Sequence, residues 1–531
     1  MMPVDPSTAS SLFTWSLATT LAVIILYRIS TRRDRSRLPL PPGPKKLPVI
    51  GNLFDIPSDR PWETYAKWSS EFDSDIIHLD AGGTSIIILN SMEAVKDLFE
   101  KRGTIYSDRP RAVMLNELMG WGEMSFAMMN HGARWRSHRK MFHETFEIGA
   151  AKQFHSQVRA SAHGLLRRIL SASRDILVDI RYTAGALILK ITYGIDVLPR
   201  DDPYIKTAEE AMHAFGIAFV PGTFLVDSIP VLRYIPSWFP GADFQRKAKH
   251  WRKVNQDLAE RPFTEAKRKI AAGTVSPSFI SLNLSPDQDG GNSKAREAPE
   301  SELKNIAVTA YAAGADTTVA ILGTFILAML KYPEAQKKAQ AEIDSVVGFG
   351  NLPHFEDKEA LPYTGALVRE LLRWKPVTPI ALPHSLTNNA DDEYKGHRIP
   401  AGSIVLANIW SLMHDPEMYE DPRSFKPERF FCDGKLNTEM RDPELVSFGI
   451  GRRTCAARNL ALSFLWMTVA SILATMDIKK AVDAEGREIE PTYEYSSFLV
   501  PLPHPFECSI TPRSKHLEQV VNATAPSSSV G

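Results

Sequence analysis

The sequence predicts a mainly α-helical protein with small β-sheets and one membrane-spanning helix at its N-terminus. Three features lead to this prediction. Helical periodicity dominates from about residue 92 onward. Short runs of β-branched residues occur at 76–89 and near 394–407. No charged residue lies between Asp5 and Arg28, a stretch close to the ~20 residues that a spanning helix needs.

Composition excludes some classes of protein. The 531 residues include 62 basic and 62 acidic side chains, so no excess of positive charge suggests a nucleic-acid partner. The three cysteines, Cys432, Cys455 and Cys508, are an odd number and widely spaced. They form no disulfide framework and no zinc motif, and they suit a reducing compartment.

The N-terminal segment 1–37 is predicted to be a membrane anchor, with its spanning helix at about 11–28. Basic residues follow the apolar stretch, so the positive-inside rule places the rest of the chain in the cytoplasm. A cleaved signal or a disordered tail is the alternative. Residues 38–48, rich in proline, should form a stiff spacer. Residues 49–515 then make one domain, and 516–531 a disordered tail.

Smaller elements are predicted from turn residues. Residues 76–89 should form a β-hairpin around Gly82-Gly83, and residues 394–407 a second small sheet. Residues 283–301, rich in Ser, Asp, Gly, Asn and Pro, should form an exposed loop.

A long helix is predicted from Glu302 to Lys331, ended by Pro333. Its middle, residues 313–318, reads Ala-Gly-Ala-Asp-Thr-Thr, which a bare helix would avoid. A local opening of the hydrogen-bond ladder here would let Asp316 and Thr317 hold water or dioxygen and relay protons. The alternative is a packing notch with polar residues that face solvent.

A loop rich in Gly and Arg, residues 448–455, ends in Cys455 and precedes an apolar helical run from Leu460 to Ile472. Two arginines, free backbone N–H groups and the positive end of a helix would favour the thiolate. A thiolate in such a loop suits haem iron. The alternative is a buried cysteine that acts as a small hydrophobe.

Two further pairs lie on helical faces. Glu370 and Arg373 stand at i, i+3, and Trp135 and Arg139 at i, i+4. Taken in their order along the chain, from Trp135 through Asp316 and Glu370 to Cys455, the motifs resemble those of the cytochrome P-450 superfamily, particularly membrane-anchored hydroxylases of basidiomycete secondary metabolism. The loop departs from the family at Ala457, where glycine is usual.

The resemblance implies one haem domain and a role for each matching residue. Cys455 would be the axial iron ligand, and Asp316 and Thr317 the catalytic acid–alcohol pair. Glu370, Arg373 and Arg429 would form a buried ionic knot behind the haem loop. The residues expected to contact the haem are Trp135, Arg139, Gly314, His384, Phe448 and Arg453.

The resemblance also implies a function. We expect a monooxygenase that uses haem and O2 on a lipophilic substrate, with electrons from NADPH through a reductase; cytochrome b5 is a further candidate donor. Residues 106–130 and 215–241 should select the substrate. The expected location is the endoplasmic reticulum membrane, with a single span and the domain in the cytosol. The alternatives are isomerisation, dehydration or peroxygenation by the same fold, or a haem-binding membrane protein without turnover.

Overall fold

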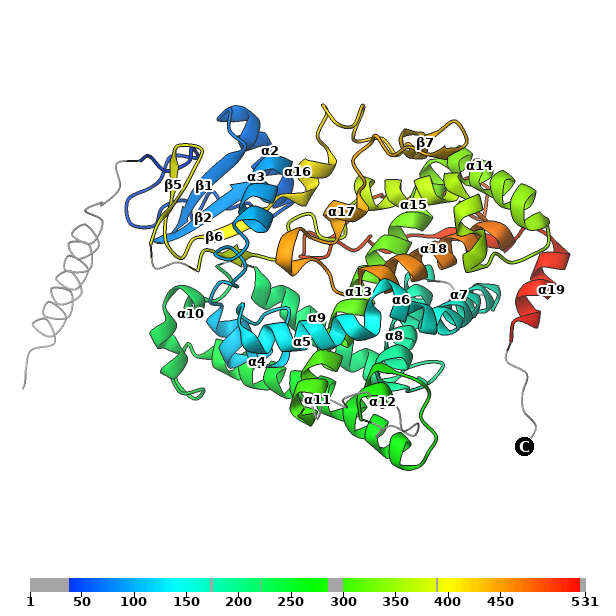
Figure 1. Cartoon of the computed structure of the whole chain (residues 1–531), viewed down its shortest axis with the longest axis horizontal. Coiled ribbons are helices and arrows are strands. Elements are labelled where there is room, and N and C mark those ends of the chain that lie inside the picture. The colour runs from blue at the N-terminus through cyan, green and yellow to red at the C-terminus, as the bar shows by residue number, and fades with distance from the viewer. Residues whose placement is uncertain (1–37, 172–174, 221, 285–298, 388–389, 526–531) are drawn as a thin grey trace, which may run out of the picture.

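A computed structural model describes residues 38–171, 175–220, 222–284, 299–387 and 390–525 (Figure 1). The predicted anchor, nearly all of the predicted 283–301 loop, and the last six residues lie outside these ranges. The described chain is mainly helical, and its largest sheet lies at the upper left of Figure 1.

The described residues form the following elements, given in chain order within each type. The α-helices are α2 (Pro61–Glu71), α3 (Met92–Val95), α4 (Trp121–Met124), α5 (Ala133–Phe146), α6 (Ile148–Ala151), α7 (His155–Leu170), α8 (Ile176–Tyr193), α9 (Pro203–Phe219), α10 (Leu225–Ser228), α11 (Asp243–Ala271), α12 (Phe279–Leu284), α13 (Glu300–Lys331), α14 (Pro333–Ile343), α15 (Pro362–Trp374), α16 (Ile409–Met413), α17 (Glu444–Ser447), α18 (Arg458–Thr475) and α19 (Lys515–Ala523). The shorter helices are η1 (Lys96–Lys101), η2 (Val113–Leu118), η3 (Lys152–Phe154), η4 (Pro230–Tyr234), η5 (Asp344–Gly348), η6 (Phe355–Ala360), η7 (Pro427–Phe430) and η8 (Gly451–Arg453). The strands are β1 (Ile76–Ala81), β2 (Thr84–Leu89), β3 (His384–Ser385), β4 (Asp392–Tyr394), β5 (His397–Ile399), β6 (Ile404–Ala407), β7 (Phe431–Cys432), β8 (Lys435–Leu436), β9 (Met476–Lys480) and β10 (Cys508–Pro512).

The largest sheet has the strand order β1-β2-β6-β3. The hairpin predicted at 76–89 is confirmed, because β1 pairs with β2 antiparallel. The segment 394–407, predicted to form a second sheet, instead contributes strands to two separate sheets. β4 and β5 form their own hairpin, whereas β6 pairs parallel with β2 and antiparallel with β3. The buried side chains of Val405, Leu406 and Ala407 explain why β6 takes an inner position.

The long predicted helix is confirmed as α13, which crosses the core and packs against α8, α9, α11 and α18 (Figure 1). Glu300 and Glu302 lie in its first turn and Lys331 in its last, as the helix dipole favours. Of the described helices, α13 and α18 are long and apolar enough to cross a bilayer, but most of each is buried inside the protein.

The prediction of a disordered tail from residue 516 is wrong for the described part. Residues Lys515–Ala523 form α19. Ser514 caps the helix by accepting a hydrogen bond from the Leu517 N–H at 3.2 Å. Leu517 and Val521, at i, i+4, are fully buried on the face of α19 that packs against α7 and α18.

The proline-rich segment also differs from the stiff spacer predicted for residues 38–48. Pro42 O accepts from the His78 N–H of β1 at 2.9 Å, and Pro39 O accepts from the Arg398 N–H of β5 at 2.7 Å. Proline carbonyls accept hydrogen bonds like any others, so the first part of the segment is bound to β1 and β5.

A buried ionic cluster joins α15 to the segment before η7. Glu370 and Arg373 are both fully buried and pair through two hydrogen bonds of 2.7 and 2.8 Å. Arg429 Nε donates to the same carboxylate at 3.2 Å, and the Lys426 N–H donates at 2.8 Å. Arg373 also donates to three backbone carbonyls, those of Met413, Pro422 and Ser424. The three predicted members of the knot therefore lie together, with their charges paired.

Replacing Arg373 by Met should lower the free energy of unfolding by about 3–5 kcal/mol, because it leaves a buried carboxylate short of its main partner. Urea denaturation measures this change. Arg268→Met on α11 is the matched control, since Arg268 and Glu265 have the same spacing and paired hydrogen bonds but Arg268 is exposed. An equal effect of both substitutions would contradict a buried knot.

Candidate active site

Cys455 follows a closed loop between α17 and α18. The Cys455 N–H donates to Phe448 O at 2.7 Å, and the Thr454 hydroxyl donates to Gly451 O at 2.7 Å. Gly451 has a φ of 77°, and a Cβ at this position would lie 2.2 Å from Phe99 O in η1. Only glycine permits this approach, so the loop packs tightly on η1 and Cys455 is held in a fixed place.

The Cys455 side chain is exposed, yet the surrounding protein raises the pKa of its thiol through desolvation. A thiol that faces a space inside the fold has both properties. Three groups oppose the effect of burial by favouring the thiolate: the Ala457 N–H, which donates to the sulfur, and the guanidinium groups of Arg139 and Arg458. Coordination to a metal ion deprotonates a thiol outright.

The arginines expected to favour the thiolate were Arg452 and Arg453, and this expectation is wrong. Arg452 donates to the Thr104 hydroxyl at 3.0 Å, and Arg453 donates to Ser107 O at 2.8 Å. Both side chains therefore bond to the segment that follows η1.

Ala457, where the family usually has glycine, causes no strain. Its φ is −94° and its ψ is 12°, a backbone conformation open to any residue. Ala457 is the N-cap of α18, and its N–H points at Cys455. The methyl group therefore leaves the hydrogen bond to the sulfur intact.

Two guanidinium groups lie around the ring of Trp135 in α5. The Arg453 guanidinium carbon is 4.5 Å from the centre of the Trp135 ring, and that of Arg139 is 5.6 Å from it. Arg139 also donates to Thr454 O at 2.5 Å, which joins α5 to the cysteine loop. The predicted residues Trp135, Arg139 and Arg453 therefore come together beside Cys455.

A third guanidinium, that of Arg109, was not predicted. Arg109 is buried, and its side chain donates to Ala127 O at 2.9 Å, Leu382 O at 3.0 Å and Pro383 O at 2.7 Å. Burial and the nearby Arg453 lower the pKa of Arg109 to about 9. Burial likewise lowers the pKa of Arg453 to about 10. Both shifts show that holding these cations in the fold is unfavourable.

Within the described ranges, none of Arg109, Arg139 and Arg453 forms an ion pair with a carboxylate. Buried cations are normally paired, because an isolated buried charge is costly. A ligand with two carboxylates beside an accessible thiol would supply the missing charge. Haem has this chemistry: an iron centre for the sulfur and two propionates for the guanidinium groups. The residues present therefore fit the predicted cofactor.

His384 lies beside this cluster but does not present the donor expected of it. Its Nδ1 is 2.7 Å from Tyr106 O, and its ring stacks on Phe99 at 3.9 Å. Burial, together with Arg109 and Arg453, lowers the pKa of His384 well below its usual value. In the neutral imidazole, Nδ1–H donates to the carbonyl and Nε2 carries no proton. His384 could thus donate to a propionate only in its protonated form.

Two adjacent stripes of α13, one formed by Ala313 and Thr317 and the other by Gly314 and Thr318, have different surroundings. The Thr317 hydroxyl donates to Ala313 O at 2.9 Å, and Ala313 is exposed although it lies in the middle of a core helix. The Thr318 hydroxyl donates to Gly314 O at 2.8 Å. A Cβ on Gly314 would lie 3.0 Å from Ile188 in α8. Gly314, predicted to contact the cofactor, therefore lets α8 pack closely because it has no side chain. Ala313 and Thr317 face an accessible space.

Asp316 faces the gap between α8 and α9. Its carboxylate accepts a hydrogen bond from Arg181 at 2.6 Å. The predicted opening of the ladder near Asp316 is absent, since α13 runs as one continuous helix. The threonine hydroxyls bond to carbonyls inside the helix instead of separating its turns.

Arg109 and Arg181 are the site residues that the sequence analysis missed. Arg109 stands in a loop with no fixed spacing to Cys455, so no pattern marks it. Arg181 offered a signal: it is a cation in α8, a helix whose other side chains are mostly apolar and buried. Such a residue usually needs an anionic partner.

Comparison with known proteins gives a consistent match. A family model described as Cytochrome P450 matches residues 41–506. The chain is 47% identical over 497 residues to Cytochrome P450 monooxygenase 98 of Postia placenta, covering 93% of this chain and 94% of that protein. It is 43% identical to Cytochrome P450 monooxygenase ple1 of Rhodocybe pseudopiperita, covering 96% of each. It is 40% identical to tryptamine 4-monooxygenase of Psilocybe cyanescens, covering 94% and 98%.

If the guanidinium cluster holds propionates, the haem-free protein should bind ferric protoporphyrin IX more tightly than its dimethyl ester. Arg109→Gln should reduce this preference by about 10- to 100-fold, because a hydrogen bond to a charged group contributes about 1.5–3 kcal/mol. Titration followed by absorbance measures both affinities. Arg111→Gln, two residues along and paired with Glu117, should keep the preference. An unchanged preference in Arg109→Gln would contradict the assignment.

Proposed function

Because this chain belongs to the cytochrome P450 family, a family of haem-thiolate monooxygenases, we propose that Cys455 is the axial ligand of the haem iron. We also propose that the protein hydroxylates a lipophilic organic substrate in fungal secondary metabolism. One observation carries the assignment of the site. An accessible thiol that receives the Ala457 N–H lies beside guanidinium groups that, among the described residues, form no ion pair with a carboxylate. Relatives in the same family are fungal monooxygenases.

Bound haem supplies the oxidation chemistry, which puts one atom of O2 into a C–H bond and reduces the other to water. Each turnover consumes the substrate, O2, two electrons and two protons, and yields the alcohol and water. The protein's own groups do the rest. Cys455 would hold the iron, and Arg109, Arg139 and Arg453 would hold the propionates. Thr317 would place its hydroxyl oxygen beside the space that Ala313 faces, where the oxygen can accept a hydrogen bond while its own proton is donated to Ala313 O.

Aromatic contacts join the two segments that are predicted to select the substrate, and they support this assignment. Trp121 in α4 meets Phe215 in α9 edge-on, with ring centres 5.0 Å apart, and Phe215 stacks on Phe219. Gly216 lies close to Phe498, which brings the segment after β9 to the same helix. Apolar side chains that line a binding region in this way favour a lipophilic substrate.

The electron donor that we propose is an NADPH-dependent reductase, with cytochrome b5 as a second candidate. Exposed cations near the cysteine loop, Arg136, Lys140 and Arg452, are suited to an acidic partner. Arg139 and Arg453 face inward and are unsuited to docking. Neither flavin nor nicotinamide has an evident binding motif in the sequence, so electrons should come from a separate protein.

Membrane attachment in the endoplasmic reticulum, with the domain in the cytosol, is part of the proposal. The segment 220–239 exposes large apolar side chains, with Trp238 78% and Leu225 70% exposed. This segment, which includes α10, lies at the same end of the molecule as the start of the described chain (Figure 1). The predicted spanning helix would precede that start, so both features could meet one bilayer.

Expression with a reductase tests the proposed function. Product analysis against testosterone, α-pinene and tryptamine covers a steroid, a terpenoid and an aromatic compound. Turnover that needs NADPH and the reductase supports a monooxygenase. Turnover with peroxide alone would favour the peroxygenase alternative, and the absence of any carbon monoxide or ligand spectrum would contradict the haem site.

Thr317→Ala should lower the yield of product per NADPH and release more hydrogen peroxide, because the hydroxyl group on the accessible stripe, which would take part in proton transfer, is lost. The loss should be about tenfold or more, within the range that general acid catalysis contributes. Thr318→Ala is the matched control, since it removes the same type of hydrogen bond on the stripe that packs against α8. Equal uncoupling in both variants would reject a special role for Thr317.

A chain that lacks residues 1–37 should still bind phosphatidylcholine vesicles through segment 220–239. Leu225→Ser with Trp238→Ser should weaken this binding about tenfold or more, since burying each side chain contributes about 1.5–3 kcal/mol. Vesicle flotation measures the bound fraction. Leu198→Ser with Val482→Ser removes exposed apolar side chains elsewhere and should leave binding unchanged. The same loss in both pairs would argue against this surface.

A further inference from the structure

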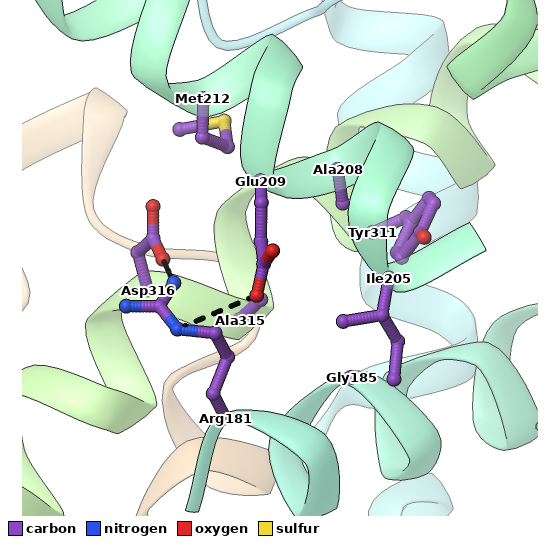
Figure 2. Close-up of a pocket in the computed structure, with 9 residues that line it drawn as sticks. All are labelled: Arg181, Gly185, Ile205, Ala208, Glu209, Met212, Tyr311, Ala315 and Asp316. Carbon is purple, nitrogen blue, oxygen red and sulfur yellow. Dashed lines mark hydrogen bonds and ion pairs between the residues drawn. The ribbon is translucent and has the colours of Figure 1, made fainter. Parts of the chain in front are cut away.

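An open cleft on the surface of the protein lies between α7, the segment from η5 to η6, and the end of α19. Its volume is about 730 Å³, within the range of sites that bind small molecules. The space between α8, α9 and α13 in Figure 2, lined in part by Arg181 and Asp316, has a volume of about 10 Å³. The cleft contains none of the residues placed around Cys455, so it is a separate feature of the fold.

Contacts from the last part of the described chain hold the walls of the cleft in place. Arg167 in α7 donates to Thr524 O at 2.9 Å, which fixes the end of α19 beside α7. Arg513, just before α19, pairs with Asp344 at the start of η5, at 2.5 Å. α19 lies beyond residue 506, the last residue that the family model matches. One wall of the cleft is therefore built by a segment outside the matched region.

Arg159 in α7 is the cation that lines the cleft. Its Nη1 donates to Nδ1 of His354 at 3.0 Å. A ring nitrogen that accepts this hydrogen bond carries no proton, so the partner of the guanidinium is a neutral imidazole. Within the described ranges, Arg159 forms no ion pair with a carboxylate. The positive charge of Arg159 is therefore available to an anion that enters the cleft.

The carboxylate that lines the cleft, that of Asp357, is held by another group. Its Oδ2 accepts from the His354 N–H at 2.7 Å, as part of a capping box at the start of η6. Asp357 thus stabilises the short helix instead of pairing with Arg159. The guanidinium groups of Arg159 and Arg167, which both act on His163, leave this side of the cleft positive.

His163, four residues after Arg159 on the same face of α7, is a second group that lacks a partner. Its Nε2 is buried and has no hydrogen-bond partner among the described residues. Burial, with Arg159, Arg167 and His354 nearby, lowers the pKa of His163 to about 4. A buried polar atom without a partner marks a place where a bound molecule or ion completes the hydrogen bonding. Both residues therefore point to a missing anion.

We propose that this cleft binds a small soluble phosphate ester, with its phosphate group at Arg159 and His163. A guanidinium suits phosphate because its planar fork donates two parallel hydrogen bonds to two phosphate oxygens. Val346, Val347 and Leu352 form the apolar side of the cleft, against which the organic part of the ester packs. The volume of the cleft leaves room for this organic part beside the phosphate.

The position of the cleft distinguishes a soluble ester from a lipid headgroup. α7 and α19 lie at the right of Figure 1, whereas α10 and the start of the described chain lie at the left. The proposed membrane contact, segment 220–239, is therefore at the other end of the molecule. A phosphate group that reaches the cleft comes from solution.

Isothermal titration calorimetry on the full-length protein in a neutral detergent tests the proposal with phenyl phosphate, inorganic phosphate and phenol. Phenyl phosphate should bind about tenfold more tightly than either of the others, because inorganic phosphate lacks the apolar part and phenol lacks the charge. Dihexanoyl phosphatidic acid represents a lipid headgroup. If this lipid binds more tightly than phenyl phosphate and depends on Arg159, the assignment to a soluble ester is overturned.

Arg159→Gln should weaken the binding of phenyl phosphate by about 10- to 100-fold, and His163→Gln by about 3- to 10-fold, because each loses a hydrogen bond to the phosphate. Arg159→Lys should recover part of the affinity. Lys152→Gln is the matched control, since it removes an exposed cation seven residues before Arg159 that does not line the cleft. Melting temperatures without ligand show that each variant is folded.

Unchanged affinity in Arg159→Gln would overturn the proposal, as would the absence of any binding of phenyl phosphate to wild type. An equal loss in Lys152→Gln would also overturn it, because binding would then reflect general attraction to positive charge.

The absorption spectrum of bound haem separates the cleft from the active site. Phenyl phosphate should leave this spectrum unchanged at concentrations that saturate the cleft. A spectral change that follows the heat of binding would place the ligand at the iron and overturn the proposal. If the protein binds no haem, the proposed function fails, but the titration of the cleft still applies because none of its residues would hold haem.

Discussion

Positive charge held inside the fold beside Cys455 is the constraint on which the rest of the site depends. Burial lowers the pKa values of Arg109 and Arg453, and the Asp108 carboxylate offsets only part of the shift of Arg453. Within the part of the chain that the structure describes, both guanidinium groups donate to neutral carbonyls. A fold keeps such groups when a ligand supplies the opposite charge. Arg109 also joins the segment before α4 to the chain before β3. The same side chain therefore shapes the site and connects distant parts of the sequence.

α13 presents its polar side chains to two different surroundings. Ala313 and Thr317 lie on its accessible stripe, whereas Gly314 packs on α8 and Asp316 joins Arg181 in the gap toward α9. The acid and the alcohol are neighbours in sequence but face different surroundings. This arrangement gives one helix an inner face beside an accessible space and an outer face in contact with α8 and α9.

Local patterns predicted much of this architecture. The hairpin at 76–89 and the long helix follow from periodicity and turn residues. The assembly of Glu370 with Arg373 and Arg429 was expected from the resemblance to the cytochrome P-450 superfamily. The roles of Arg109 and Gly314 did not follow, because each depends on which distant segment packs against it. The strand β6 joined β2 for the same reason. The helix α19 was missed since its nine residues contain only two buried apolar positions.

The bond between the Cys455 sulfur and iron is the central claim, and the absorption of the reduced protein with carbon monoxide tests it most directly. Thiolate ligation shifts this band to the red. Cys455→Ser should abolish the shifted band, whereas Cys432→Ser, which changes an exposed cysteine in β7, should retain it. A folded Cys455→Ser protein that keeps the red-shifted band would contradict the account.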